Sequence, residues 1–307
     1  MEVAPMKIRI GTRASHLART QAQEVERLLN EVGIETSIVI IKTTGDGNQN
    51  KDYAQIGSQG IFVKELELAL INNETDIAVH SAKDLPIHMD PLLGIHAYLK
   101  RTDPADIIVN TYTEDLGELT QNQLTIGTSS TRRKAWIENL YPNFKVEGLR
   151  GNVPTRIKAL KNDYDSIIIA KAGFDRLLNS SLNDIPKNIF DGLYHARLDP
   201  SIFIPPAGQG AIAIQCLNEK KDITDAIMLI NDELTFKCIE DERVILRYLD
   251  GGCNVALGIY ARFIPITSLF ELLIMHLANG ELKTKKYAYT ELQHIEDTIL
   301  KDIQFNV

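Results

Sequence analysis

The chain contains the stretch Asp76-Ile77-Ala78-Val79-His80-Ser81-Ala82-Lys83-Asp84, in which a short apolar run ends in polar and charged residues. The segment 76–80, with apolar residues at 77–79, is typical of a buried strand. In open parallel sheets, ligands bind beyond the carboxyl ends of the strands. We therefore expect the residues that follow this strand to include functional side chains.

Short apolar strands and amphipathic helices alternate on both sides of this stretch. Upstream, strands are predicted at 7–11 and 38–42 and helices at 15–32 and 61–71. Beyond Pro104 the pattern starts again, with strands predicted at 124–127, 146–149 and 166–170 and helices at 130–140 and 154–161. Strands that alternate with helices indicate an α/β fold with mainly parallel sheets covered on both faces.

Two segments interrupt the pattern, Arg101–Asp106 and the Pro- and Gly-rich Pro205–Gly210, and both are predicted to cross between domains. From Ile223 the chain becomes helical, and a hairpin around Asn279-Gly280 and a last helix follow. The predicted domains are 1–102 with about 204–228, then 103–203, and a small α+β domain at 229–307.

The composition is that of a globular protein, with 307 residues, 44% hydrophobic residues and a net charge of -8. The negative charge disfavours nucleic acid and anionic membranes as partners. No apolar run is long enough for a membrane helix or a secretory signal, so a cytoplasmic location is expected. The spacing of Cys216, Cys238 and Cys253 favours neither a disulfide framework nor a zinc site.

Four predicted strand ends repeat one chemistry, hydroxyl groups beside Arg or Lys, at 11–15, 80–84, 127–133 and 149–156. Arginine binds carboxylates through two parallel hydrogen bonds, so the pattern predicts a small ligand with several carboxylates. Phosphate is a weaker alternative, and no nucleotide-binding motif is present. Any one of these arginines could instead cover a helix end or pair with a surface acid.

Asp84 and Cys253 are the candidates for reactive groups. Asp84 is either a general acid or base or an ion-pair partner of Lys83. Cys253 follows two glycines, which suits an exposed reactive thiol, whereas Cys216 and Cys238 are predicted to be packed. The histidines lack metal-ligand spacing, so no metal site is predicted, and His80 is expected to make a structural hydrogen bond.

Seven motifs resemble, in order, those of the hydroxymethylbilane synthase (porphobilinogen deaminase) family. They are Thr12-Arg13-x-Ser15-x-Leu17-Ala18, Gly60-x-Phe62-x-Lys64-Glu65-Leu66-Glu67, the stretch 76–84, Gly127-Thr128-Ser129-Ser130-x-Arg132-Arg133, Leu149-Arg150-Gly151-Asn152-Val153-x-Thr155-Arg156, Gly208-Gln209-Gly210-Ala211 and Gly251-Gly252-Cys253. Together they extend over about residues 7 to 258.

The resemblance implies a three-domain monomer whose first two domains are similar to type II periplasmic binding proteins. It also implies a transferase of tetrapyrrole (haem) biosynthesis that joins four porphobilinogen molecules to a dipyrromethane cofactor, attached through a thioether to Cys253, and releases hydroxymethylbilane by hydrolysis. Asp84 matches the catalytic carboxylate of the family. The residues that match cofactor- and substrate-binding positions are Arg13, Ser15, Lys83, Thr128, Ser130, Arg132, Arg133, Arg150, Asn152, Arg156, Arg176 and Gln209.

Three residues depart from the family pattern. Gln59 replaces a usual Lys, Ala256 a usual Pro, and Pro206 a usual small residue. The loss of a cation at position 59 predicts slower turnover or looser product retention. Two alternatives to the enzyme remain, a binding module that holds a small anion reversibly and an inactive homologue with an intact ligand site.

Overall fold

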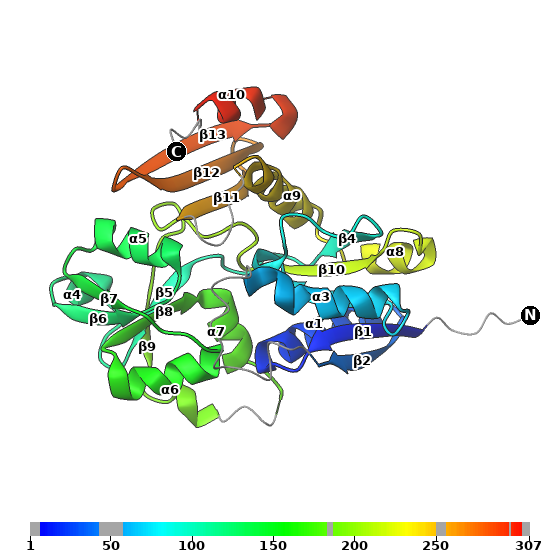
Figure 1. Ribbon diagram of the computed structural model, residues 1–307, viewed down its shortest axis with the longest axis horizontal. Helices are drawn as coiled ribbons and strands as arrows, with labels where there is room; N and C mark the ends of the chain where they lie inside the picture. Colours follow the sequence, from blue (N-terminus) through cyan, green and yellow to red (C-terminus); the bar gives the residue numbers. More distant parts are fainter. Residues whose placement is uncertain (1–6, 43–57, 183–186, 250–255, 295, 303–307) are drawn as a thin grey trace, which may run out of the picture. The chain divides into compact units, whose positions relative to one another are not determined.

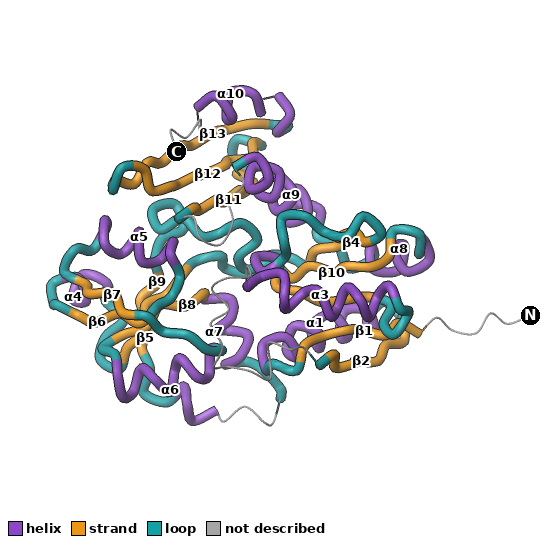
Figure 2. The backbone as a smooth tube through the Cα atoms, in the orientation of Figure 1, coloured by secondary structure: helices purple, strands orange, loops and turns teal. Residues whose placement is uncertain are grey.

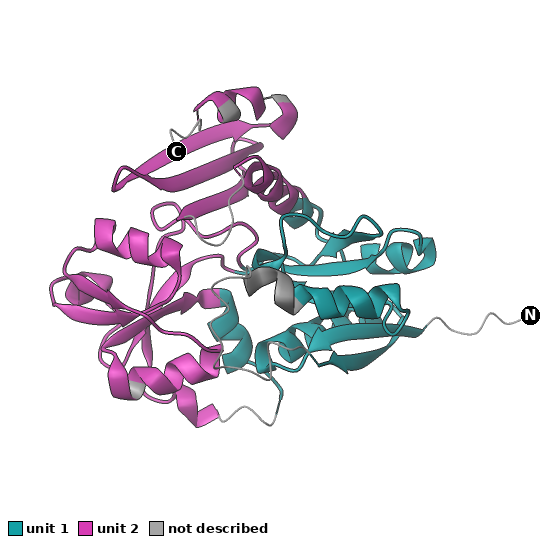
Figure 3. Cartoon of the chain, viewed as in Figure 1, with its two compact units in different colours: residues 1–102, 172–186, 210–236 teal, residues 103–171, 187–209, 237–307 magenta. Residues whose placement is uncertain are grey.

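The structure is a computed structural model that describes residues 7–42, 58–182, 187–249, 256–294 and 296–302. It consists of two compact units (Figure 3), one of residues 1–102, 172–186 and 210–236 and the other of 103–171, 187–209 and 237–307. Two of the passages between the units, at 102–103 and 209–210, lie within the segments where the sequence predicts a crossing.

The first unit is built on a five-stranded mixed sheet with the order β2-β1-β3-β10-β4. The neighbours β1 and β2, and the neighbours β4 and β10, are labelled in Figures 1 and 2. β1 is parallel to β2 and β3, whereas β10 is antiparallel to β3 and β4. Its elements are β1 (Lys7–Arg13), α1 (His16–Glu31), β2 (Glu35–Ile41), α3 (Ser58–Ile71), β3 (Ile77–Ser81), the 3-10 helix η2 (Ala82–Asp84), β4 (Leu93–Tyr98), α7 (Lys171–Leu178), β10 (Ile212–Leu217) and α8 (Lys221–Met228).

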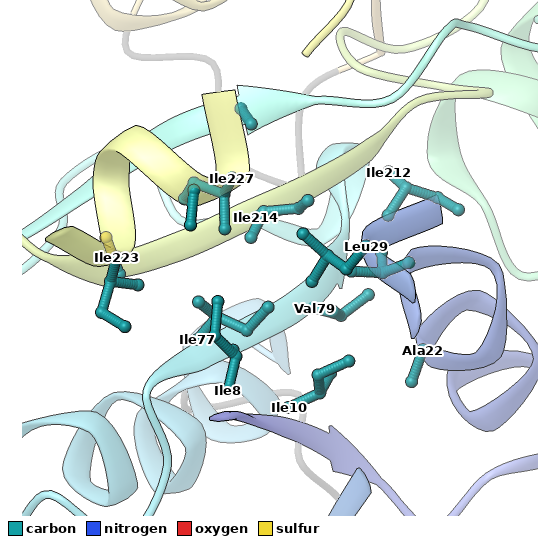
Figure 4. Packing of buried hydrophobic residues seen from close by; sticks show 14 of the residues in the cluster. Ile8, Ile10, Ala22, Leu29, Ile77, Val79, Ile212, Ile214, Ile223 and Ile227 are labelled. Atoms are coloured by element: carbon teal, nitrogen blue, oxygen red, sulfur yellow. The ribbon is translucent and has the colours of Figure 1, made fainter. Parts of the chain in front are cut away.

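Apolar side chains from distant parts of the chain form the core of this unit (Figure 4). The residues that the figure labels are Ile8, Ile10, Ala22, Leu29, Ile77, Val79, Ile212, Ile214, Ile223 and Ile227. They come from β1, β3, β10, α1 and α8, so the late segment 212–227 completes a core that the first hundred residues begin. Because its apolar side chains are buried on the sheet, β3 holds its polar carboxyl end in a defined position.

The second unit contains another five-stranded mixed sheet, with the order β7-β6-β8-β5-β9. β6 is parallel to β7 and β8, and β5 is antiparallel to β8 and β9. Its elements are β5 (Asp106–Asn110), α4 (Leu116–Thr120), β6 (Leu124–Gly127), α5 (Thr131–Leu140), β7 (Phe144–Glu147), α6 (Val153–Asp163), β8 (Ser166–Ala170), η3 (Lys187–Phe190) and β9 (Tyr194–Arg197).

The C-terminal segment forms an antiparallel sheet with the order β11-β12-β13. Its elements are α9 (Glu233–Tyr248), β11 (Leu257–Ile264), β12 (Leu269–Ala278), β13 (Glu281–Tyr289), η4 (Leu292–His294) and α10 (Glu296–Asp302). β12 and β13 form the predicted hairpin, with positive φ at Asn279 and Gly280. Tyr260 and Met275 of this sheet share a core with Trp136 of α5, which explains why 237–307 belong to the second unit.

The predicted α/β class, with mixed sheets and a small C-terminal α+β region, is confirmed. The strands β4, β5, β9, β10 and β11 were not predicted. Among the described residues, we find no helix with the length and hydropathy needed to cross a membrane.

Candidate active site

The first unit brings the ends of two neighbouring strands together. β1 and β3 are parallel, with Gly11 opposite Ala78, so both carboxyl ends lie at the same edge of the sheet. A small cavity of about 80 Å³ at this edge is lined by Arg13, Ser15, Leu17, Ala18, Gln21, Val63, Leu66, Val79, His80, Ser81 and Asp84. Three of the predicted site residues, Arg13, Ser15 and Asp84, therefore line one pocket.

Local structure holds the polar side chains of this pocket in place. Ser15 is the N-cap of α1, and its Oγ accepts a hydrogen bond from the backbone N–H of Ala18 at 3.4 Å. Asp84 ends η2 with an exposed side chain, and Lys83 of the same short helix is half-buried. The pocket thus combines a guanidinium, hydroxyl groups and a carboxylate, which suits a ligand that carries both acidic groups and N–H donors.

Gln21 and His80 line the pocket and were absent from the predicted site. Gln21 is buried, and its Nε2 donates to Ser81 Oγ at 2.9 Å. His80 makes the structural hydrogen bond that the sequence predicts, through its Nε2 to Gln215 Oε1 at 2.9 Å. Burial lowers the pKa of His80 to about 4, so its ring is neutral at neutral pH. No local pattern could reveal this contact, because Gln215 lies on a distant strand.

The second unit places further predicted residues at the starts of two helices. Ser130 is the N-cap of α5 and accepts from the N–H of Arg133 at 3.3 Å. Asn152 is the N-cap of α6 and accepts from the N–H of Thr155 at 2.9 Å. These helices follow the parallel neighbours β6 and β7, so both N-termini lie at the same sheet edge. Free N–H groups at helix N-termini attract anions.

The remaining predicted residues near these helix starts differ in exposure. Thr128 is buried, and its Oγ1 accepts from the N–H of Ser130 at 3.2 Å. Arg150 is exposed, whereas the half-buried Arg156 donates through Nε to the carbonyl of Gly151 at 2.7 Å. This edge thus combines hydroxyl, amide and guanidinium groups, all of which can donate hydrogen bonds to carboxylates.

Arg132 and Arg133 are buried and share one carboxylate. Their Nη2 atoms lie 2.5 and 2.7 Å from the two oxygens of Asp106, which also accepts from Gln209 Nε2 at 3.0 Å. Burial opposes the charge of Asp106, but the guanidiniums of Arg133 and Arg132 outweigh it and hold the pKa of this carboxyl well below its usual range. Two guanidiniums against one carboxylate leave a net positive charge at this point of the second unit.

Arg176 of α7 is also largely buried. Its Nε lies 3.3 Å from Glu24 Oε2, and its Nη2 donates to the carbonyl of Gly210 at 3.2 Å. Cys253 and the side chain of Gln59 lie outside the residues that the structure describes. The prediction that Cys216 and Cys238 are packed is confirmed, because both are buried.

Comparisons with known proteins agree with the resemblance. The family described as "Porphobilinogen deaminase, dipyromethane cofactor binding domain" matches residues 8–225. "Probable porphobilinogen deaminase" of Methanocaldococcus jannaschii is 40% identical over 277 residues, which is 90% of each chain. "Porphobilinogen deaminase" of Orientia tsutsugamushi is 38% identical over 290 residues, 94% of this chain and 92% of that one. Among solved structures, the periplasmic VFT2 domain of Bordetella pertussis BvgS matches with a TM-score of 0.40 and 15% identity, over 78% of this chain and 92% of that domain.

The family match and the alignments with these two relatives each cover most of the sequence. The chain belongs to the porphobilinogen deaminase family.

Proposed function

We propose that the protein is a hydroxymethylbilane synthase, a transferase of tetrapyrrole biosynthesis. It would join four porphobilinogen molecules in turn to a dipyrromethane primer, with loss of one ammonia at each addition, and release the linear tetrapyrrole by hydrolysis. The observation that carries this proposal is the pocket at the carboxyl ends of β1 and β3, where Arg13 and Ser15 line the same cavity as Asp84.

The donors in each unit fit a ligand that carries carboxylates. The pyrrole ring of porphobilinogen bears an acetate and a propionate group, so this ligand is negatively charged. The protein as a whole is negatively charged too, with a net charge of -8. Binding therefore needs a local concentration of positive charge and hydrogen-bond donors. We assign this role to Arg13, Ser15 and Lys83 in the first unit and to Thr128, Ser130, Arg150, Asn152 and Arg156 in the second.

Four further residues that match binding positions of the family contact other protein groups in this structure. Arg132, Arg133 and Gln209 surround Asp106, and Arg176 pairs with Glu24. We propose that Arg132 and Arg133 act on bound carboxylates through their net positive charge, since one carboxylate offsets only one of them. We propose Gln209 and Arg176 as binding residues for the cofactor or substrate because their positions match those of binding residues in the family motifs.

The primer would supply a pyrrole carbon as the acceptor for each new ring, and we propose that Cys253 holds it through a thioether. Intact-protein mass spectrometry tests this attachment. The purified protein should exceed its sequence mass by one dipyrrole, and Cys253→Ser should lack the excess and the activity. A protein at its bare sequence mass that still forms hydroxymethylbilane would refute the attachment. Reversible anion binding with neither adduct nor turnover would favour the binding module, and an adduct without turnover the inactive homologue.

We propose that the exposed carboxylate of Asp84 stabilises positive charge that develops on a pyrrole nitrogen and moves protons there. Asp84→Asn keeps the shape of the side chain and removes its charge, so the variant should keep the primer but lose about 100-fold or more in turnover. Asp225→Asn, at an exposed position of α8 in the same unit, is the matched control and should stay near the normal rate. Near-normal turnover of Asp84→Asn would remove Asp84 from this role.

We also propose that the protein is a monomer and is located in the cytoplasm. Size-exclusion chromatography with light scattering should give the mass of one chain, 34.4 kDa plus the primer. A stable dimer at working concentration would contradict the proposed assembly.

A further inference from the structure

A chain of hydrogen bonds runs from the pocket into the first unit. His80 of β3 is 6% exposed and lines the pocket. Its Nε2 lies 2.9 Å from Gln215 Oε1 on β10, and Gln215 Nε2 donates to Glu67 Oε1 on α3 at 3.0 Å. Side chains from β3, α3 and the distant strand β10 therefore meet behind one side chain of the pocket.

The partners of Gln215 define the direction of these hydrogen bonds. Its amide nitrogen faces two acceptors, Glu67 Oε1 at 3.0 Å and Met89 Sδ at 3.8 Å. The amide oxygen therefore faces His80, and an oxygen there can only accept. His80 must carry a proton on Nε2 to make this bond.

The charge of the ring decides what its other nitrogen offers. Burial has the largest effect on the pKa of His80 and lowers it, the hydrogen bond with Gln215 opposes this in part, and the nearby charge of Arg13 adds a smaller lowering. At neutral pH the ring therefore holds one proton, and that proton is on Nε2. Nδ1 is left with a lone pair and can only accept a hydrogen bond.

We propose that His80 Nδ1 accepts a hydrogen bond from the ring N–H of a pyrrole bound in this pocket, and that Gln215 and Glu67 are positioning residues that hold His80 in the required tautomer. This inference rests on the proposed function and adds a substrate contact to it. The guanidinium of Arg13 lies near His80 and disfavours a second cation there. The neutral Nδ1 of His80, close to the charge of Arg13, therefore suits a neutral N–H donor. The Asp84 carboxylate in the same pocket suits a pyrrole nitrogen on which positive charge develops.

Nitrogen-15 NMR of the histidine rings tests the tautomer directly. The holoprotein should show one neutral ring protonated on Nε2 at neutral pH, assigned by its loss in His80→Gln. In Gln215→Leu the same ring should populate both tautomers. A charged His80 ring, or one protonated on Nδ1, would overturn the proposal whether or not the protein acts on porphobilinogen.

The contact itself is tested by adding porphobilinogen to the Asp84→Asn holoprotein, in which slow turnover leaves the ligand intact. The Nδ1 resonance of His80 should shift by the amount typical of an accepted hydrogen bond. An unchanged Nδ1 resonance at saturating porphobilinogen would overturn the contact. Failure of the proposed function is recognised separately on the unsubstituted protein, which would then lack the dipyrrole mass, the turnover of porphobilinogen, or both.

Two substitutions separate a ligand contact from a structural role. His80→Gln places an amide near the former Nε2 and keeps the link to Gln215, whereas His80→Asn keeps an oxygen near the former Nδ1 and loses that link. We expect KM for porphobilinogen to rise about tenfold in His80→Gln and by less than about threefold in His80→Asn, with kcat less affected. A purely structural His80 predicts the opposite order, so greater damage in His80→Asn would refute the contact.

Discussion

Replacement of Asp106 with asparagine tests the charge balance of the second unit. Asp106 is fully buried and accepts hydrogen bonds from Arg132, Arg133 and Gln209. The asparagine keeps the size of the side chain but leaves both guanidiniums buried without a counter-charge. Breaking a buried ion pair by removal of one partner costs about 3–5 kcal/mol, and we expect Asp106→Asn to lower the free energy of unfolding of this unit by that amount.

The chain provides its own reporter for this measurement. Its one tryptophan, Trp136, is fully buried in the core of the second unit, and its Nε1 donates to the carbonyl of Ile204, which also accepts from Arg132. Urea unfolding followed by Trp136 fluorescence therefore reports on this region. With a urea dependence of about 1–3 kcal/mol per molar, a loss of about 3 kcal/mol lowers the midpoint by about 1 M or more.

Asp103→Asn is the matched control. Asp103 pairs with Arg197 at 2.7 Å in the same unit, but their side chains are 25% and 46% exposed. Solvent screens such a pair, so we expect a loss of less than about 1 kcal/mol. Equal midpoint shifts for Asp106→Asn and Asp103→Asn would refute the assignment of Asp106 as the carboxylate on which the two buried arginines depend.

The lowered pKa of Asp106 also predicts how the difference in stability between the original protein and Asp106→Asn depends on pH. A carboxyl whose pKa is lower in the folded than in the unfolded state stabilises the fold above its unfolded pKa, about 3.9, and loses this contribution as the pH falls toward the folded pKa. The difference in stability between the original protein and Asp106→Asn should therefore be constant near neutral pH and shrink below about pH 4. A difference that grows on acidification would contradict the sign of the shift.

Two further changes should affect stability by known mechanisms. Glu242 is fully buried and accepts hydrogen bonds from the backbone N–H groups of Gly208 at 2.6 Å and Ala261 at 2.8 Å. Glu242→Gln directs an amide N–H at one of these donors. We therefore expect it to lower the stability measured by thermal unfolding by about 1–3 kcal/mol. Glu281→Gln in β13 of the same unit, whose side chain is 73% exposed, is the control, and an equal cost in both would refute the role of Glu242. Gly280 has a φ of 81°, so Gly280→Val should cost about 1–2 kcal/mol, and an unchanged midpoint would contradict this strain.

Features that depend on neighbouring residues could be predicted from the sequence. The apolar runs 124–127 and 166–170 are bounded by polar or turn-forming residues, and β6 and β8 have those bounds. The helices predicted to start at Ser15 and Ser130 begin one residue later in the structure, and both serines are N-caps. The helix predicted at 154–161 begins at Val153, with Asn152 as its N-cap. The pocket residues Arg13, Ser15 and Asp84 could be predicted because parallel strands place their carboxyl ends together.

The tertiary structure alone decided the pairings between distant segments. β10 lies between β3 and β4 although more than a hundred residues separate it from either strand, and no local periodicity specifies that partner. Nothing in the sequence around Asp106 indicates that Arg132 and Arg133 pair with it in the folded protein. The tautomer of His80 likewise depends on its contact with the distant Gln215. Several strands and helices, β6 and β8 among them, could be predicted because they depend on spacing and side-chain type over a few residues. Burial and charge compensation were decided only in the folded protein, because they depend on which distant groups exclude water from one another.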